Sequence, residues 1–372
     1  MEGDIACSVL VPVFNEERYI EASVEAMLRQ RFDGEFEFLF ADGGSTDRTP
    51  EILERLALED PRIRVLRNPS RTVSSGLNVA LGHARGRYAL RMDAHTVYRD
   101  DYARLGVERL AQGGTRWVSG PQVPKGHGSV SRAVALALSG AIGRGGSRKW
   151  GQDEPGEGPE FELDTGVFAG VWERKTLLEY GGWDERWTCN EDSEMAARFL
   201  TRGERLICLP AMAADYVPRD TVPGLWKQYF RYGEFRARTS RRHPRSLRAS
   251  TLLPPAVVVA AASAIVAPSR LRRLARLGQA AYGVSLLGAG VRSLGQTGSL
   301  VDAALVPVVL LVMHFAHGLG QLYGWLKYGP PLAAMASLCH VDRLLTRTAS
   351  AQQPVSAPSL DPGQRDPQRT GL

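Results

Sequence analysis

Acidic and small polar side chains follow three apolar runs in the first hundred residues. The runs cover residues 7–13, 36–40 and 88–92, and they lead into the sequences VPVFNEE, ADGGSTD and RMDAH. In an open parallel sheet, groups of this kind collect in the ligand-binding crevice at the carboxyl ends of the strands. Carboxylates bind divalent cations, and glycines let a ligand approach the backbone. The pattern indicates an enzyme that handles an activated nucleotide with a divalent cation.

Helices and strands that would position these groups alternate along the chain. Helical spacing of apolar residues is found in residues 16–30, 47–58 and 73–84. Short strands are expected at 36–40, 63–66 and 88–92. Further on, we predict a loop at 143–159, a strand at 161–171, and helices at 174–180, 193–202 and 225–238. Such alternation is typical of a parallel α/β layer.

Three more polar segments follow, with the sequences GGWDE at 181–185, NEDSE at 190–194 and QYFRYG at 228–233. In their order and spacing, the six segments resemble the family 2 glycosyltransferases, which are inverting, nucleotide-sugar-dependent enzymes. The resemblance covers about residues 8–240. It implies a GT-A fold, with a Rossmann-like, mostly parallel sheet flanked by helices. The Asp-Ala-His and Gln-Tyr-Phe-Arg-Tyr-Gly segments together are most similar to ExoA-type enzymes, which extend lipid-linked exopolysaccharide repeats.

The resemblance implies that the first two strand ends bind the nucleotide sugar. Asp42 would accept a hydrogen bond from the base, usually uracil, and Pro12, Asn15 and Glu16 lie at the same edge. An Asp before two glycines also favours a turn, so a purely turn-forming Asp42 is the alternative.

Asp93 and His95 occupy the position of the family's Asp-x-Asp motif, with His in place of the second Asp. The resemblance implies that they bind a divalent metal, Mn²⁺ or Mg²⁺, and that Asp93 also contacts the nucleotide sugar. An imidazole ligand shifts the preference towards manganese. The alternative for His95 is a loop residue that only forms hydrogen bonds.

Asp192 and Glu191 match the family's Glu-Asp signature, in which the Asp is the general base. We therefore expect Asp192 to act as the base, with Glu191 beside it. The structural alternative is that Asp192 and Glu194 cap the following helix.

The segment at 228–233 is similar to the Gln-x-x-Arg-Trp motif of processive polysaccharide synthases, with Tyr in place of Trp. By that resemblance, Gln228 and Arg231 would bind the donor diphosphate and Tyr232 would stack on the acceptor sugar. Asp164 lies where relatives contact a substrate, and we assign it to the acceptor. The alternative for residues 225–238 is an amphipathic helix at a membrane interface.

Composition limits the cellular setting of the chain. It has 372 residues, a net charge of +6 and scattered cysteines, which indicate no metal knuckle or redox pair. Arginines crowd residues 236–248 without an aromatic nucleic-acid-binding pattern, so we expect no nucleic-acid partner. Basic residues beside an apolar span instead favour a cytoplasmic membrane flank. The N-terminus has no signal-peptide pattern, so we expect the catalytic part in the cytosol.

Three apolar runs cover residues 252–267, 280–291 and 300–326. The middle run is short against the roughly 20 residues of a span, and the number of spans stays open. A buried helical bundle is the alternative to membrane insertion. We predict a catalytic domain at 1–240, membrane-associated helices at 241–345 and a disordered tail at 346–372.

These observations predict a metal-dependent, inverting transferase that moves a hexose from a UDP-sugar to a polyprenyl-linked saccharide at the cytoplasmic face of the cell membrane. A polyprenyl-phosphate sugar synthase is the alternative within enzymes. A catalytically silent membrane scaffold is the alternative from another class, and the retained Asp42, Asp93 and Asp192 argue against it.

Overall fold

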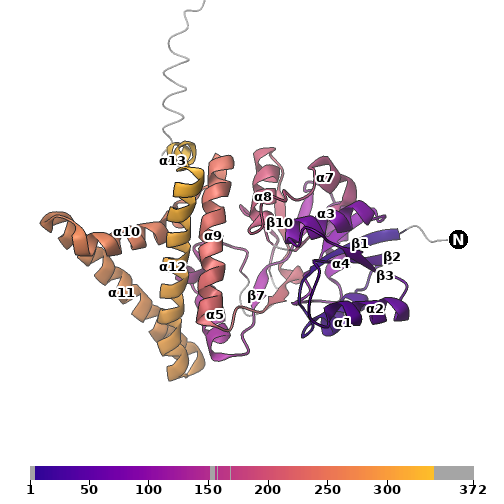
Figure 1. Ribbon diagram of the computed structural model, residues 1–372, viewed down its shortest axis with the longest axis horizontal. Coiled ribbons are helices and arrows are strands. Elements are labelled where there is room, and N and C mark those ends of the chain that lie inside the picture. The colour runs from indigo at the N-terminus through magenta and orange to yellow at the C-terminus, as the bar shows by residue number, and fades with distance from the viewer. Residues whose placement is uncertain (1–4, 151–155, 157, 168, 339–372) are drawn as a thin grey trace, which may run out of the picture.

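A computed structural model describes residues 5–150, 156, 158–167 and 169–338. The tail predicted at 346–372 lies outside the described residues, as does part of the predicted 143–159 loop. Within the described residues, an α/β half is followed by a group of long helices (Figure 1).

The strands and helices of the α/β half are, in chain order, β1 (Ile5–Val13), α1 (Ile20–Leu28), β2 (Glu35–Asp42), α2 (Thr49–Glu59), β3 (Ile63–Arg67), α3 (Val73–His83), β4 (Tyr88–Arg91), β5 (Thr96–Tyr98), α4 (Tyr102–Ala111), β6 (Trp117–Ser119), β7 (Gln122–Pro124), α5 (Ser129–Ser139), α6 (Ala141–Arg144), β8 (Phe161–Glu162), β9 (Gly170–Glu173), α7 (Arg174–Glu179), α8 (Glu191–Thr201), β10 (Leu206–Cys208) and β11 (Ala214–Tyr216). The strand predicted at 161–171 is wrong as one element, since it forms two separate strands, β8 and β9.

The main sheet has eight strands in the order β3-β2-β1-β4-β9-β6-β10-β8. Its first four strands are parallel, and β6 and β10 are parallel to each other. Strand β9 runs antiparallel between β4 and β6. Because β2, β1 and β4 are neighbours, their carboxyl ends place the segments after Asp42, Val13 and Arg91 along one edge.

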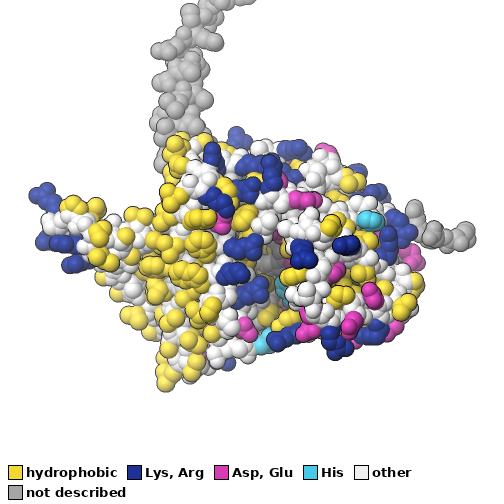
Figure 2. All heavy atoms as spheres, viewed as in Figure 1, with side chains coloured by type: hydrophobic (Ala, Val, Ile, Leu, Met, Phe, Trp, Pro, Cys, Tyr) yellow, Lys and Arg dark blue, Asp and Glu magenta, His cyan; other side chains and the backbone are white. Residues whose placement is uncertain are grey.

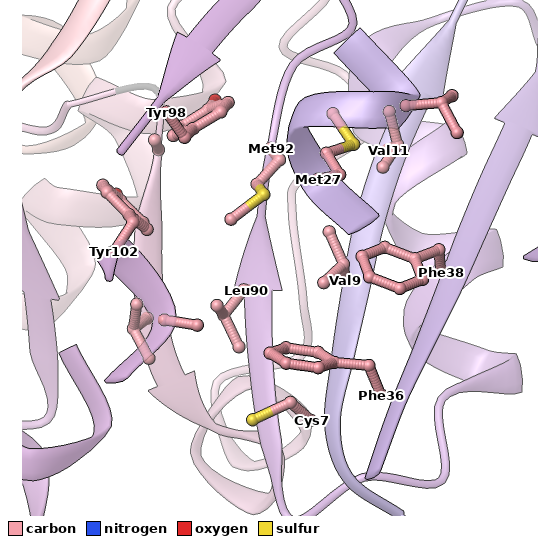
Figure 3. Packing of buried hydrophobic residues seen from close by; sticks show 14 of the residues in the cluster. Cys7, Val9, Val11, Met27, Phe36, Phe38, Leu90, Met92, Tyr98 and Tyr102 are labelled. Atoms are coloured by element: carbon pink, nitrogen blue, oxygen red, sulfur yellow. The ribbon is translucent and has the colours of Figure 1, made fainter. Parts of the chain in front are cut away.

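Alternating side chains of the central strands pack on both faces of the sheet. Val9 and Val11 of β1 belong to one buried cluster, whereas Leu10 belongs to the cluster on the other face. In Figure 3, Val11 lies beside Met27 of α1, and Val9 beside Phe38 of β2. This period of two is what a strand buried on both faces requires.

Between residues 222 and 338, the C-terminal half forms the helices α9 (Val222–Arg242), α10 (Leu253–Val266), α11 (Ser269–Thr297), α12 (Leu300–Tyr328) and α13 (Leu332–Leu338). The apolar run at 280–291 is not a separate segment, because it is continuous with the arginines at 270–276 in the single helix α11. Two stretches are long and apolar enough to cross a membrane, Ala249–Val266 and Leu300–Tyr328, each with a mean hydropathy of 1.9. Only 11% of the first is buried, so most of its apolar surface faces outward (Figure 2).

Helices α9 and α12 pack at unusually close range (Figure 1). A Cβ at Gly233 of α9 would overlap the carbonyl of His317, and one at Gly320 of α12 would overlap the carbonyl of Phe230. Small residues allow this approach, as they do between membrane helices. The apolar side of α9, with Leu225 and Phe235, is buried. The buried apolar side of α9 therefore packs inside the protein, and a position of α9 at a membrane interface stays a prediction.

Candidate active site

A cavity of about 780 Å³ lies between the α/β half and the long helices. Its lining includes five of the predicted site residues that carry acidic, amide or imidazole groups: Asp93, His95, Glu191, Asp192 and Gln228. Arg231 and Tyr232 line it as well. Figure 2 shows a hollow at this border, with Lys and Arg side chains along its helical side. The volume is typical of a site for a small organic ligand.

A buried arginine joins the two acidic motifs. Nε and Nη2 of Arg91 donate to the two carboxylate oxygens of Asp93, at 2.9 and 3.2 Å, and Nη1 donates to Oε1 of Glu191 at 2.9 Å. Burial alone would lower the pKa of Arg91, but the charges of Asp93 and Glu191 raise this pKa above its ordinary value. Arg91 thus fixes two segments that are 100 residues apart in sequence. Sequence reasoning gave Arg91 no role, although a charged residue inside a buried strand was the available signal.

Asp192 and Glu191 differ in their surroundings although they are adjacent. Burial raises the pKa of Glu191, and its carboxylate is bonded to Arg91. Within the described residues, the carboxylate of Asp192 has no hydrogen bond or ion pair to another side chain, and it lines the cavity. Asn190, with a left-handed φ of 55°, occupies the N-cap position of α8 without a side-chain capping hydrogen bond. Asp192 is the second residue of the helix, so its predicted capping role is wrong.

Glu194, the other predicted cap, is buried and serves a structural purpose. It accepts from Nε of Arg198 at 2.9 Å and lies 3.1 Å from Nε2 of His243. This network ties α8 to the end of α9. Glu194 therefore holds the helix whose first turn presents Asp192.

His95 lies beside Glu16, with Nδ1 3.0 Å from Oε1 of Glu16. Burial would lower the pKa of His95, but this hydrogen bond and the charge of Asp93 raise it. When Nδ1 bonds a carboxylate, Nε2 is left available as a ligand, which is the usual arrangement of a metal-binding histidine. The described residues contain no cluster of three His, Cys, Asp or Glu side chains that could hold an ion alone. The donor set instead fits an ion that takes its other ligands from substrate phosphates.

The predicted nucleotide edge lies outside the lining of the large cavity. Asp42 accepts hydrogen bonds from the backbone N–H of Gly44 at 3.0 Å and of Ser45 at 3.2 Å. It borders a second, shallower hollow with residues of α2 and β3. Asp42 therefore forms the turn that we predicted as its alternative role. Binding of the base by Asp42 stays a prediction.

Asn15 links the first two strand ends. Its backbone N–H donates to Oγ of Ser45, and its side-chain carbonyl accepts from the N–H of Thr46, both at 2.8 Å. Its φ of 55° turns the chain sharply after β1. Pro12 lies within β1, beside Gly76 of α3. The two strand-end loops therefore form one joined surface next to Glu16 and His95.

Helix α9 contributes a polar row to the cavity. Nε2 of Gln228 donates to the hydroxyls of Tyr232 at 3.0 Å and Tyr216 at 3.2 Å. Nη2 of Arg231 donates to the carbonyl of Thr188 at 2.8 Å. These bonds bring the predicted diphosphate-binding and acceptor-binding side chains to the cavity wall, facing the first turn of α8.

Asp164 is placed differently from its predicted role. It is exposed and forms an ion pair with Nη1 of Arg248 at 2.9 Å. Its neighbour Thr165 lines the cavity, and Asp164 does not. Acceptor binding by Asp164 stays a prediction, and the ion pair indicates that it positions Arg248.

The cavity also has a helical wall that sequence reasoning missed. Leu253 and Pro254 of α10 line it, as do Met313, His314 and His317 of α12. The two histidines interrupt an otherwise apolar run, and that interruption was the only sequence signal. The structure thus brings the apolar helices to the same cavity as the acidic motifs.

A glycosyl transferase family 2 model matches residues 8–161. The chain is 32% identical over 323 residues to the succinoglycan biosynthesis protein ExoA of Rhizobium meliloti (strain 1021), which covers 84% of this chain and 92% of that protein. The chain belongs to glycosyltransferase family 2. The predicted enzyme class is confirmed, and this finding favours it over the alternative of a catalytically silent membrane scaffold.

A second relative by sequence and one solved structure are also similar to this chain. A dolichyl N-acetyl-α-D-glucosaminyl phosphate 3-β-D-2,3-diacetamido-2,3-dideoxy-β-D-glucuronosyltransferase of Methanococcus voltae is 25% identical over 240 residues, covering 61% of this chain and 71% of the relative. The mannosyltransferase PcManGT of Pyrobaculum calidifontis, solved in complex with GDP-Man and Mn²⁺, superposes with a TM-score of 0.54 at 19% identity, covering 85% of this chain and 90% of that one. The predicted GT-A fold with a mostly parallel sheet is confirmed.

Proposed function

We propose that this glycosyltransferase moves a hexose from a UDP-sugar to a polyprenyl-linked saccharide, in the synthesis of an exopolysaccharide or another cell-envelope glycan. One observation carries the proposal: the carboxylate of Asp192 opens into a cavity bounded by Asp93 and His95 on one side and by the apolar helices α10 and α12 on the other. A polar donor and a lipid-linked acceptor would meet there. The similarity to a succinoglycan biosynthesis protein supports the acceptor class.

The transfer follows as a single displacement. Asp192 takes the proton of the acceptor hydroxyl as its oxygen forms a bond to the anomeric carbon of the hexose. The bond from that carbon to the diphosphate oxygen breaks on the opposite face, and the electron pair leaves with the nucleoside diphosphate. Because there is one displacement, the anomeric configuration is inverted. A positioned base contributes about 10²–10⁴-fold to such a rate.

Asp93 and His95 would hold the divalent ion, with Glu16 orienting His95 through the 3.0 Å hydrogen bond to Nδ1. When bound, Mn²⁺ or Mg²⁺ supplies positive charge for the departing diphosphate. Arg91 fixes the carboxylates of Asp93 and Glu191 through its hydrogen bonds, so both stay in place at the cavity wall. Gln228 and Arg231 would contact the donor diphosphate from α9, and Tyr232 would contact the acceptor sugar. Asp42, with Pro12 and Asn15 beside it, would bind the nucleoside at the adjoining edge.

The apolar faces of α10 and α12 support a position at the cell membrane, with the catalytic part in the cytoplasm. Val259, Ile265 and Leu311 are examples of their exposed side chains. Exposing so much apolar surface to water is unfavourable. We expect the chain to remain with membranes through washes with high salt and with carbonate. Removal by salt alone would contradict membrane insertion and favour the helical bundle.

The test of function is a transfer assay with the full chain in lipid vesicles. A panel of labelled UDP- and GDP-sugars is offered with lipid-linked saccharides and, separately, with bare polyprenyl phosphate. We expect label from a UDP-hexose to enter the lipid-linked saccharide fraction. Transfer to bare polyprenyl phosphate alone would establish the sugar synthase, and no transfer from any nucleotide sugar would overturn the proposal.

A further inference from the structure

The helical end of the cavity gathers positive charge that the donor-binding role does not use. Lys149, Arg236 of α9 and Arg248, which precedes α10, all line the cavity. Among the described residues that line the cavity, eight are Lys or Arg and four are Asp or Glu. The helical end is therefore an environment for an anion.

These three cations are poorly compensated within the described residues. Lys149 and Arg236 have no carboxylate partner there within 4.0 Å. Arg248 pairs with Asp164 through Nη1, while its Nε is buried without a hydrogen-bond partner in the same part of the chain. Burial lowers the pKa of Arg236 to about 10, and the charge of Arg248 adds to this. Gathering like charges is unfavourable unless an anion joins them.

The cluster is also next to the apolar helices. Arg236 lies one turn beyond Gly233, which touches the backbone of α12 at His317. Arg248 comes just before the stretch Ala249–Val266, whose outer face is exposed and apolar. Leu253 and Met313 line the cavity from α10 and α12. An anion bound here would have an apolar surface beside it.

Asp192 lines the same cavity as this cluster and the predicted metal-binding side chains. Its charge acts on Arg91, which is bonded to Asp93, and also on Lys149 and Arg236. A general base contacts the hydroxyl of the acceptor, whose oxygen attacks the anomeric carbon of the donor. Asp93 and His95 are then on the donor side, and the three cations are on the acceptor side.

We infer that Lys149, Arg236 and Arg248 form a binding site for the phosphate or diphosphate group of the acceptor's lipid carrier, whose hydrocarbon chain lies against α10 and α12. Arginine matches phosphate oxygens with two parallel N–H donors, and lysine adds a point charge. The site holds the carrier while its saccharide reaches Asp192. This inference rests on the proposed function and extends it to the acceptor.

The test compares acceptor and donor kinetics in the full chain, reconstituted in phosphatidylcholine vesicles. Lys149→Gln and Arg236→Gln are measured with Arg241→Gln, which removes an exposed cation from the same helix α9. We expect each of the first two to raise the KM for the lipid-linked acceptor about tenfold or more, because a charge-assisted hydrogen bond is lost. The KM for the nucleotide sugar and all constants of Arg241→Gln should stay near those of the unmodified chain. Lys149→Gln lies outside the helices and keeps the test valid if Arg236→Gln does not fold.

Competition experiments identify the source of the phosphate. Geranylgeranyl diphosphate should compete with the acceptor, whereas geranylgeraniol and inorganic pyrophosphate should compete much less. Equal competition by pyrophosphate would assign the cluster to a soluble diphosphate. A raised KM for the nucleotide sugar, with the acceptor KM unchanged, would assign it to the donor, and either result would overturn the inference. If the unmodified chain transfers to no lipid-linked acceptor, the proposed function itself fails.

Discussion

The two sides of the cavity differ in how their charges are balanced. On the sheet side, Arg91 bonds Asp93 and Glu191, and His95 bonds Glu16. On the helical side, Lys149 and Arg236 have no carboxylate partner within the described residues. One side is organised by its own side chains before any ligand arrives, and the other presents charge to a ligand. One active site can therefore hold the groups that bind the donor in a fixed arrangement while it keeps, for the acceptor, cations that are unpaired within the described residues.

Asp192 lines the cavity as the predicted general base, so its loss should give the largest effect. Asp192→Asn should lower kcat by about 10²–10⁴-fold, because the amide keeps the shape of the side chain but cannot accept the proton. UDP binding and thermal unfolding should change little. The measurement is steady-state transfer with UDP binding by calorimetry. Turnover near that of the unmodified chain would move the base to Glu191 or to another residue.

The paired charges of the sheet side can be broken at Arg91. Arg91→Met would leave Asp93 and Glu191 close together without a cation, and we expect the free energy of unfolding to fall by about 3–5 kcal/mol. Urea unfolding measures it. Arg104→Met is the matched control, since Arg104 forms only exposed pairs, as with Glu108, which should contribute at most about 1 kcal/mol. Similar losses of unfolding free energy in the two variants would mean that the buried ion pairs of Arg91 do not add to stability.

Metal binding on the sheet side can be weakened by a substitution that leaves the predicted ligands Asp93 and His95 unchanged. Glu16→Gln removes the carboxylate that orients His95, and we expect the Mn²⁺ concentration needed for half-maximal transfer to rise about 10–100-fold. EDTA should abolish transfer by the unmodified chain. Glu17→Gln is the control, because the carboxylate of Glu17 accepts a hydrogen bond from the backbone N–H of Arg48 and from no other group in the described part of the chain. An unchanged metal titration in Glu16→Gln would exclude His95 from metal binding.

The helical side depends on the close contact of α9 with α12. Gly233→Leu should push these helices apart and lower stability by about 1–3 kcal/mol. The acceptor KM should change more than UDP binding, since Asp93 and His95 are not on these helices. Gly283→Leu on α11 is the control, because a side chain there meets open space. Equal effects on donor and acceptor would show that the two sides are not independent.

The sequence was informative where a function depends on a few consecutive residues at a strand end. The apolar runs before Asp42 and Asp93 predicted the parallel strands and their edge, and Asp192 was found from a short acidic motif. Arg91 was missed because its partner Glu191 lies 100 residues away. The helical wall was missed for the same reason, since nothing local to His317 reveals that it meets Gly233. Contacts made by folding carry no local pattern.

The division of the cavity can be tested in one experiment by mapping two photoprobes on the full chain in vesicles. One probe is 5-azido-UDP, and the other is a polyprenyl diphosphate that bears a benzophenone near the diphosphate. We expect the uridine probe to label peptides around Asp42 and the lipid probe to label α10 or α12. Excess UDP should remove only the first label. Labelling of the same peptides by both probes, or loss of the lipid label with UDP alone, would contradict this division of the cavity.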